Sequence, residues 1–503
     1  MPPELSPSES DLSRSNVALW AAWIPVVVLI ALLVLNVSIF GDSATSGANQ
    51  IALWLAAMVA GVIGRVHGTG FETMAGGITR SVHSAMSAIL ILLVIGALIG
   101  TWMISGVVPG MVWLGLKLLS PEYFLFAAAC VAAIVSLASG SSWSTVATVG
   151  VASLGVAKAM GVSEPWAAGA VISGAYFGDK ISPLSDTTNL AAAMADVPLF
   201  VHIRHMLWTT VPSMTIALGV YLAVGWSSDP LVANDRTHEL LMAIDEKFWL
   251  SPWLAVIPVT VFGLVLFRVH ALAALLVGTL LGGLFAAGFQ PDVVREIAKA
   301  SGFEGSYLRQ AYSVVIETMA NKVSLKSDNS LANELLNGKG MSGMLNTIWL
   351  IISAMSFGGV MESCGLLQRI TNSLMQFARS TGSLIATTAS SCLFLNLTAS
   401  DQYLSIVVPG RMFRQAYADR GLAGKNLSRT LEDSGTVTSV LVPWNTCGAF
   451  QAVTLDVATL AFAPFCLFNW ISPLMTILFG FLGIGIAKEK KDGELPAAER
   501  SDA

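Results

Sequence analysis

The dominant feature of this sequence is a succession of apolar runs, most of them long enough to cross a membrane as a helix. They lie at 17–40, 51–64, 86–106, 123–161, 165–195 and 206–227 and, after an acidic linker, at 248–268, 271–288, 343–367, 382–412, 433–455 and 459–487. Only 12% of the 503 residues are charged, against roughly 25% in soluble domains. Because so much apolar surface must face lipid, we expect an all-α polytopic membrane protein and exclude disordered, fibrous and disulfide-rich secreted chains.

Charge and cysteine content exclude further classes of function. With 27 basic and 32 acidic residues the net charge is −5, whereas nucleic-acid binding requires a basic surface. The five cysteines lie in apolar runs without metal-ligand spacing, which is typical of small core residues. There is no phosphate-binding loop and no nucleophile motif. We therefore expect a protein that is not an enzyme and has no cofactor.

Two of the apolar runs, 123–161 and 382–412, are too long for one crossing and carry polar residues near their middles. These polar segments are Ser139-Gly-Ser-Ser-Trp-Ser144 and Asn396-Leu-Thr-Ala-Ser-Asp-Gln402. Each run is either a helix plus an interfacial piece or a re-entrant hairpin with the polar segment at its tip. We favour the hairpin, whose irregular backbone is tolerated at membrane depth where it lines a cavity or is buried in protein.

The two halves of the chain resemble each other. Pro212-Ser-Met-Thr-Ile-Ala-Leu-Gly219 matches Pro473-Leu-Met-Thr-Ile-Leu-Phe-Gly480, and two shorter matches have nearly the same offset. We predict two repeats, each of five spans and one hairpin, and the odd number of spans inverts the second repeat. The expected organisation is a tail at 1–16, repeat 1 at 17–227 (hairpin 123–161, broken helix 165–195), a linker at 228–247, repeat 2 at 248–487 (hairpin 382–412, broken helix 433–455) and a tail at 488–503.

Basic residues predict the orientation. With the N-terminus inside, fifteen Lys and Arg residues fall on cytoplasmic segments, while the short outer loops hold only Lys117, Lys158, Arg236 and Lys247. This bias is typical of bacterial membrane proteins. We expect a multi-pass protein of the cytoplasmic (inner) membrane with both termini in the cytoplasm. The role of segment 289–340 stays open.

Charged residues within membrane segments are costly and therefore candidates for function. Run 165–195 contains Asp179 and Lys180, is interrupted at Ser182-Pro183 and continues after Ser185-Asp186 with Thr187, Thr188 and Asn189. Run 433–455 repeats the pattern, with Asp433, Thr436 and Thr438 before Pro443, and Asn445 and Thr446 after it. Carboxylate, hydroxyl, amide and backbone oxygens suit a hard cation such as Na⁺. Low dielectric favours a protonated carboxyl unless a cation is bound, so a proton and a cation compete for such a site.

Structural roles compete with these interpretations. Asp186 could serve only as a helix cap, and Asp179 and Lys180 could form a structural ion pair. Glu432 follows a basic loop, and we interpret it as solvated; for Asp433 both interpretations stay open. Asp401, at the predicted tip of the second hairpin, is better explained by a function.

At these residues the sequence resembles the NhaC family of sodium/proton antiporters. The similar stretches are Ser173-Gly-Ala-Tyr-Phe-Gly-Asp-Lys-Ile-Ser-Pro-Leu-Ser-Asp-Thr-Thr-Asn-Leu190, Asp401-Gln-Tyr-Leu-Ser-Ile-Val-Val-Pro-Gly-Arg-Met-Phe413, Ser428–Ser439 and Pro443–Gly448. The resemblance covers nearly the whole chain. It implies an inverted-repeat fold with discontinuous helices at midplane, two re-entrant hairpins and a homodimer in the lipid bilayer.

The resemblance also implies Na⁺/H⁺ exchange by alternating access, with Asp179 and Asp186 as the principal acids and Asp401 and Asp433 as their partners. Lys180 is a possible counter-charge. The remaining oxygen donors are expected from Ser141, Ser142, Ser144, Ser185, Thr187, Thr188, Asn189, Thr398, Ser400, Thr436, Thr438, Asn445 and Thr446. The alternative is Na⁺- or H⁺-coupled transport of a small organic acid or amino acid, for example malate/lactate exchange. A channel is disfavoured because no filter motif is evident.

Overall fold

The computed structural model describes residues 17–40, 44, 46–226, 241–267, 269–324, 337–338 and 340–489. The predicted N-terminal tail, residues 490–503 of the predicted C-terminal tail and most of the predicted linker therefore lie outside the described residues. Nearly all described elements are helices, and the two strands, β1 (Val323–Ser324) and β2 (Asn337–Gly338), form a two-residue antiparallel pair. The chain is thus an all-helical polytopic membrane protein, as predicted.

The helices of the first half run from α1 to α11. Their bounds are α1 (Leu19–Phe40), α2 (Ala48–Val66), α3 (Phe71–Ser84), α4 (Met86–Ile104), α5 (Val107–Leu118), α6 (Pro121–Ser139), α7 (Ser142–Thr145), α8 (Val151–Ala159), α9 (Glu164–Ile181), α10 (Asp186–Met194) and α11 (Leu199–Trp226). A π-helical turn, Val146–Gly150, joins α7 to α8.

The second half begins with a short helix at 241–247. It continues with α13 (Val256–Leu266), α14 (Ala271–Phe289), α15 (Pro291–Ala300), α16 (Tyr307–Ala320), α18 (Leu345–Ser363), α19 (Leu366–Leu374), α20 (Thr381–Thr398), α21 (Gln402–Ala418), α22 (Gly424–Leu431), α23 (Thr446–Leu455), α24 (Thr459–Phe462) and α25 (Leu467–Leu482). A π-helical turn, Glu432–Thr436, follows α22.

Seven of the described helices are long and apolar enough to cross a membrane, or up to nine if each of two sharply bent helix pairs is one span. The seven are α1, α2, α4, α6, α11, α14 and α18. Because α6 alone is long enough to cross the membrane, the run 123–161 forms a re-entrant hairpin only if the turn after α6 lies within the bilayer. The re-entrant interpretation therefore stays a prediction. The inverted repeat and the ten spans likewise stay predictions.

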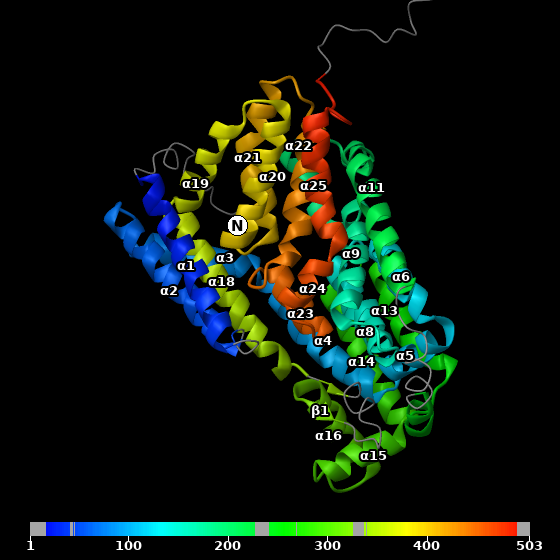
Figure 1. Ribbon diagram of the computed structural model, residues 1–503. Helices are drawn as coiled ribbons and strands as arrows, with labels where there is room; N and C mark the ends of the chain where they lie inside the picture. The colour runs from blue at the N-terminus through cyan, green and yellow to red at the C-terminus, as the bar shows by residue number, and fades with distance from the viewer. Residues whose placement is uncertain are drawn as a thin grey trace, which may run out of the picture.

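Figure 1 shows how the helices are grouped. On one side α1, α2, α3, α18 and α19 pack together, and in the centre α9, α20, α21, α22 and α25 lie near one another. At one end of the molecule α15 and α16 extend beyond the other helices, and the loops that flank α21 and α22 lie at the opposite end. The segments that carry the predicted site residues therefore meet in the central group.

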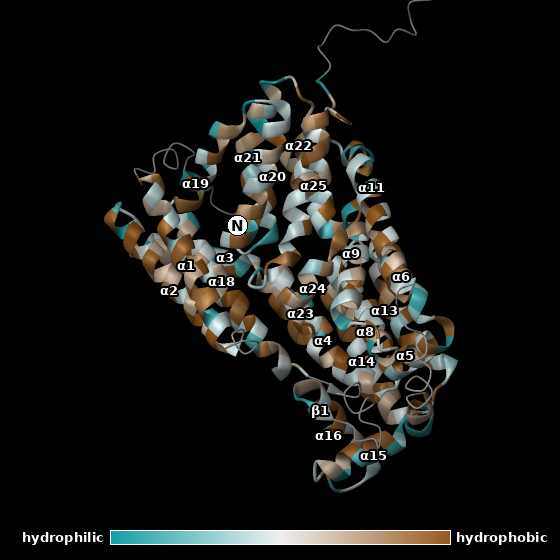
Figure 2. Cartoon of the chain, viewed as in Figure 1, coloured by the Kyte–Doolittle hydropathy of each residue, from teal (hydrophilic) through white to brown (hydrophobic). Residues whose placement is uncertain are grey.

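The distribution of polarity is that of a protein surrounded by lipid. Large apolar side chains such as Val34, Val62 and Ile134 are more than 60% exposed, and apolar residues dominate the outer helices in Figure 2. Polar and charged side chains, including Lys180 and Glu432, are instead fully buried. In water this arrangement would expose a large apolar surface, whereas in a bilayer it is the stable one.

Close packing of α9 against α6 determines where Asp179, near the end of α9, lies. Gly174 and Gly178 lie on the α6-facing side of α9, four residues apart. A Cβ atom at Gly178 would lie 2.6 Å from the backbone nitrogen of Leu137 and 2.8 Å from Cβ of Ser136. Small residues at this spacing allow two helices in lipid to approach closely. Asp179, the next residue, is consequently held against the segment that follows α6.

Candidate ion-binding site

The first polar segment, after α6, makes direct contact with Asp179. Gly140 has a φ of 68°, which reverses the chain, and Ser141 caps α7 by accepting a hydrogen bond from the Ser144 backbone nitrogen at 3.2 Å. The backbone nitrogen and the Oγ of Ser142 both donate to Oδ2 of Asp179, at 3.0 and 2.7 Å. Asp179 is buried, and its Oδ1 accepts no hydrogen bond from the described part of the chain.

Hydroxyl groups cap the start of α10 across the break at 182–185. Ser185 Oγ accepts from the Thr188 backbone nitrogen at 3.4 Å and lies 3.1 Å from Thr187 Oγ1. Thr188 Oγ1 donates to the carbonyl of Lys180 at 2.9 Å, and Asn189 Nδ2 donates to the carbonyl of Ser185 at 2.6 Å. Ser185, Thr187 and Thr188 therefore stabilise the break itself.

Asp186 lies at the surface of the structure rather than in its interior. Its Oδ1 accepts from the Thr187 backbone nitrogen at 2.9 Å, and the hydroxyl of Tyr403 on α21 donates to its other oxygen. Asp186 is exposed, unlike Asp179. The hydrogen bonds of Ser142 go to Asp179 and not to Asp186. The reason is geometric, because the close α6–α9 packing brings the turn onto the end of α9.

Lys180 and Asp433 form a buried ion pair between the two halves. Both side chains are fully buried, and Lys180 Nζ also donates to Ser472 Oγ at 2.9 Å. Asp433 accepts further hydrogen bonds from Thr209 Oγ1 at 2.8 Å and from Ser472 Oγ at 3.3 Å. The counter-charge predicted at Lys180 is thus paired with Asp433. No Asp179–Lys180 ion pair occurs within the described residues.

Glu432 is fully buried, so its interpretation as a solvated residue is wrong. Its Oε1 accepts from Thr187 Oγ1 at 3.2 Å, and its Oε2 has no partner in the described part of the chain. The physical reason is that α22, although polar in sequence, packs inside the protein, with residues 426–431 all buried. A basic loop before a helix therefore does not mean that the whole helix lies at the membrane–water interface.

The second polar segment, between α20 and α21, contacts the start of α23. Asp401 is 3% exposed and caps α21, accepting from the Leu404 backbone nitrogen at 2.8 Å. Ser400 has a φ of 60°, and its carbonyl accepts from the Thr446 backbone nitrogen at 3.1 Å. Its Oγ has no partner in the described part of the chain. The structure thus brings Ser400 to Thr446.

Amide side chains connect this turn to the segment before Pro443. Asn396 Nδ2 donates to the Gly435 carbonyl at 2.8 Å and to Thr438 Oγ1 at 2.9 Å. Asn445 caps α23 and donates to Asn396. Thr398 Oγ1 instead donates to a carbonyl of its own helix at 2.8 Å, and Thr436 Oγ1 has no partner among the described residues. Asp401 and this network form a second polar centre beside the first.

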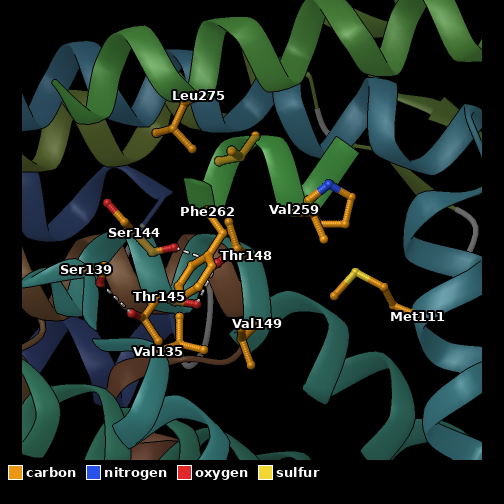
Figure 3. Close-up of a pocket in the computed structure, with 12 residues that line it drawn as sticks. Met111, Val135, Ser139, Ser144, Thr145, Thr148, Val149, Val259, Phe262 and Leu275 are labelled. Carbon is orange, nitrogen blue, oxygen red and sulfur yellow. Dashed lines mark hydrogen bonds between the residues drawn. The ribbon is translucent and has the colours of Figure 1, made fainter. Parts of the chain in front are cut away.

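A cavity of about 220 Å³ lies beside the turn after α6 and is shown in Figure 3. Ser139, Ser144, Thr145 and Thr148 contribute hydroxyls to its lining, and the other lining residues are apolar. Thr145 and Thr148 donate to backbone carbonyls at 2.9 and 2.8 Å. Because no carboxylate lines this cavity, it is a less suitable place for a cation than the surroundings of Asp179.

Sequence reasoning did not select Glu432, Tyr403, Thr209 or Ser472. Glu432 could have been selected from the sequence, because it directly precedes Asp433. That part of the second half corresponds to the Asp179 region of the first half. Tyr403, Thr209 and Ser472 carried no such signal, since their roles depend on contacts between distant segments. In the described part of the chain, no three His, Cys, Asp or Glu side chains are grouped as a metal centre. Any cation here would be bound mainly by neutral oxygens and one or two carboxylates.

Comparisons with known proteins agree with the resemblance. The family model of the Na⁺/H⁺ antiporter family matches residues 174–484. The Na⁺/H⁺ antiporter NhaC of Alkalihalophilus pseudofirmus is 39% identical, covering 88% of this chain and 92% of the relative. NhaC of Bacillus subtilis is 35% identical over 86% and 92% of the two chains. The malate-2H⁺/Na⁺-lactate antiporter of B. subtilis is 32% identical, covering 90% and 92%.

Proposed function

Since the chain belongs to the NhaC family of Na⁺/H⁺ antiporters, we propose that it exchanges Na⁺ for H⁺ across the cytoplasmic membrane. The observation that carries the proposal is the environment of Asp179, a buried carboxylate that accepts two hydrogen bonds from Ser142 and keeps one oxygen without a partner among the described residues. Such an oxygen can receive either a proton or a cation, and this competition couples the two ions. The exchange would serve pH and sodium homeostasis.

The proposed mechanism is secondary active transport by alternating access. In a low-dielectric interior an ionised carboxylate is unfavourable unless a positive species lies against it. Na⁺ binding therefore expels the proton, and protonation expels Na⁺. If the site opens to one side of the membrane at a time, an ion carried across is released when the competing ion replaces it on that side. The gradient of one ion therefore drives the movement of the other.

The proposal includes the architecture that the resemblance implies. The two halves form inverted repeats, each with five spans and one re-entrant hairpin, and the breaks at 182–185 and 442–445 lie near midplane. Both termini lie in the cytoplasm, and the protein is a homodimer. The support is the pair of polar turns, at 140–141 and 399–401, each of which contacts a segment beside a helix break.

Of the four predicted acids, we assign Asp179 and Asp401 as the candidate ion- and proton-binding groups, and we give Asp186 and Asp433 other roles. Asp179 and Asp401 are supported by their burial at the two turns. For Asp433 the ion pair with Lys180 supports a role as a fixed charge instead. Asp186, at the surface beside Tyr403, would act in ion entry.

The test is Na⁺-dependent proton movement in proteoliposomes with a pH-sensitive dye. Asp179→Asn and Asp186→Asn are each expected to abolish the exchange while the protein remains folded. Glu164→Gln is the matched control, because Glu164 lies at the other end of α9 and pairs with Lys158 at 3.7 Å. Undiminished exchange in Asp179→Asn would remove that residue from the mechanism.

A second candidate is exchange of a small organic acid or amino acid coupled to Na⁺ or H⁺. It is favoured by the 32% identity to a malate-2H⁺/Na⁺-lactate antiporter. The pairing of Lys180 with Asp433 weighs against it, because that cation is not available to a carboxylate substrate. Uptake of malate or lactate that requires a Na⁺ gradient, with no Na⁺/H⁺ exchange in the absence of the organic acid, would favour this candidate.

A further inference from the structure

Two buried carboxyl groups in the central helix group each have one oxygen that no group in the described part of the chain contacts by a hydrogen bond. They are Oδ1 of Asp179, at the end of α9, and Oε2 of Glu432, at the start of the π-helical turn after α22. Asp179 is 5% exposed and Glu432 is fully buried. Buried polar atoms are nearly always paired, so two unpaired carboxyl oxygens in one region indicate a missing ligand.

The two carboxyl groups lie close enough for their charges to interact. Thr187 Oγ1 donates to Glu432 and lies 3.1 Å from Ser185 Oγ, and Oγ1 of the next residue, Thr188, lies 3.5 Å from the carbonyl oxygen of Asp179. Lys180 is already paired with Asp433 and hydrogen-bonded to Ser472. Two like charges at a buried site repel each other unless a positive species lies between them. A proton on either group or a cation between them removes this repulsion, and a cation is the species that both carboxylates can bind at once.

Neighbouring oxygens complete a donor set of the kind that alkali cations prefer. Thr187 donates to Oε1 of Glu432, and Ser142 donates to Oδ2 of Asp179. The hydroxyl of Ser185 lies 3.1 Å from that of Thr187, and the hydroxyl of Thr436, at the other end of the π-helical turn that begins at Glu432, has no hydrogen-bond partner in the described chain. Hydroxyl and carboxylate oxygens are hard ligands that match a hard cation.

The adjacent acid, Asp433, is differently placed. It pairs with Lys180 and accepts hydrogen bonds from Thr209 and Ser472. A carboxylate with a cationic partner and two hydroxyl donors has little remaining capacity for a transported ion. Consecutive residues of the π-helical turn thus face different surroundings, and Glu432 is the one with a free oxygen.

We propose that the transported Na⁺ binds between Asp179 and Glu432, with hydroxyl donors from Thr187, Ser185 and Thr436, and that Asp433 is the counter-charge of Lys180 and not an ion ligand. This inference rests on the proposed function and adds Glu432 to it. The site joins the two halves of the chain, since Asp179 and Glu432 are 253 residues apart in sequence. Na⁺ binding would therefore hold the two broken segments together.

Two measurements test the inference separately from the function. The first is equilibrium binding of radioactive Na⁺ to the purified full-length protein in detergent, and the second is the KM for Na⁺ of exchange in proteoliposomes. Glu432→Gln keeps the size of the side chain and its ability to accept from Thr187, so it is expected to fold. We expect at least tenfold weaker Na⁺ binding in Glu432→Gln and wild-type binding in the control Glu164→Gln.

The conservative variant Glu432→Asp provides a second readout. It keeps the carboxylate on a shorter side chain, so its Na⁺ affinity should lie between those of the wild type and Glu432→Gln, and it tests the inference if Glu432→Gln does not fold. Wild-type Na⁺ affinity in both Glu432 variants, or no Na⁺ binding by the wild-type protein, would overturn the inference. A wild-type protein that binds Na⁺ through Glu432 but exchanges no protons would contradict only the proposed function.

Discussion

At the scale of single residues, the Lys180–Asp433 pair illustrates how a buried charge is tolerated. Neither side chain is exposed, and the carboxylate receives two further hydrogen bonds, from Thr209 and Ser472. A pair of this kind contributes little net stability relative to apolar residues, but removal of one partner leaves an uncompensated buried charge.

Asp433→Asn should therefore destabilise the protein by about 3–5 kcal/mol, since Lys180 would remain buried without a counter-ion. The double variant Lys180→Met, Asp433→Leu removes both charges and should be much more stable than the single variant. Thermal unfolding of the purified variants in detergent measures the difference. Equal loss of stability in both would show that the hydrogen bonds to Asp433, and not its charge, dominate.

The candidate site shows which residues sequence reasoning can and cannot identify. Asp179 and Asp401 were selected because an acid in an apolar run is conspicuous, and the structure buries both at turns, while their role in ion binding stays a prediction. Glu432 was misjudged because its surroundings depend on a distant part of the chain. It accepts a hydrogen bond from the hydroxyl of Thr187, 245 residues away in sequence. Lys180 was expected to neutralise a carboxylate, but the sequence offered Asp179 as readily as the distant Asp433. Burial of a polar helix such as α22 depends on tertiary packing, which local pattern does not reveal.

At the scale of elements, the turn after α6 depends on one glycine. Gly140 has a φ of 68°, and a Cβ atom there would lie 2.6 Å from Cβ and 2.7 Å from the carbonyl carbon of Leu184, in the break between α9 and α10. The turn and the break are therefore packed against each other. Any side chain at this position would separate them.

Gly140→Ala should lower stability by more than the roughly 1–2 kcal/mol of a left-handed backbone alone, because the clash with Leu184 is added. The displaced turn would move Ser142 away from Asp179, so Na⁺/H⁺ exchange should fall at least tenfold. Gly161→Ala is the matched control, since Gly161 has a φ of 71° with no atom within 4 Å of the added Cβ. It should show only the backbone cost in thermal unfolding and near-normal exchange. The interpretation fails if both variants behave alike.

The order of elements was predictable to a useful extent. The polar segments 139–144 and 396–402 coincide with the ends of α6 and α20, and the break expected at Ser182-Pro183 lies between α9 and α10. Their apolar flanks and the helix-breaking proline made these features visible. The π-helical turns at Val146–Gly150 and Glu432–Thr436 had no sequence signal. Such turns arise from local competition among tertiary contacts and are frequent at functional sites.

At the scale of the whole molecule, contacts between the two halves converge on the candidate site. Lys180 pairs with Asp433, Thr187 contacts Glu432, and Tyr403 contacts Asp186. Each contact joins the α9–α10 region to a segment more than 200 residues later in the chain. A change in occupancy at the site therefore alters the forces between the halves, which is a physical requirement for alternating access.

The proposed orientation leads to a prediction about which end of the molecule faces outward. Figure 1 places the turn between α15 and α16 at one end and the end of α21 at the other. Glu304, in that turn, and Arg420, in the turn that follows α21, are both exposed. The excess of basic residues near α21 and α22 predicts that this end is cytoplasmic.

In intact cells, Glu304→Cys should react with a membrane-impermeant maleimide, whereas Arg420→Cys should react only after permeabilisation. The unsubstituted protein is the blank for both, because four of its five cysteines are buried and Cys130, on α6, is only partly exposed. Labelling of Arg420→Cys from outside, without labelling of Glu304→Cys, would invert the whole arrangement. Because the two substitutions lie at opposite ends of one rigid set of helices, their labelling must change together. Reaction of both residues from the same side would therefore contradict the spanning arrangement itself and not just its direction.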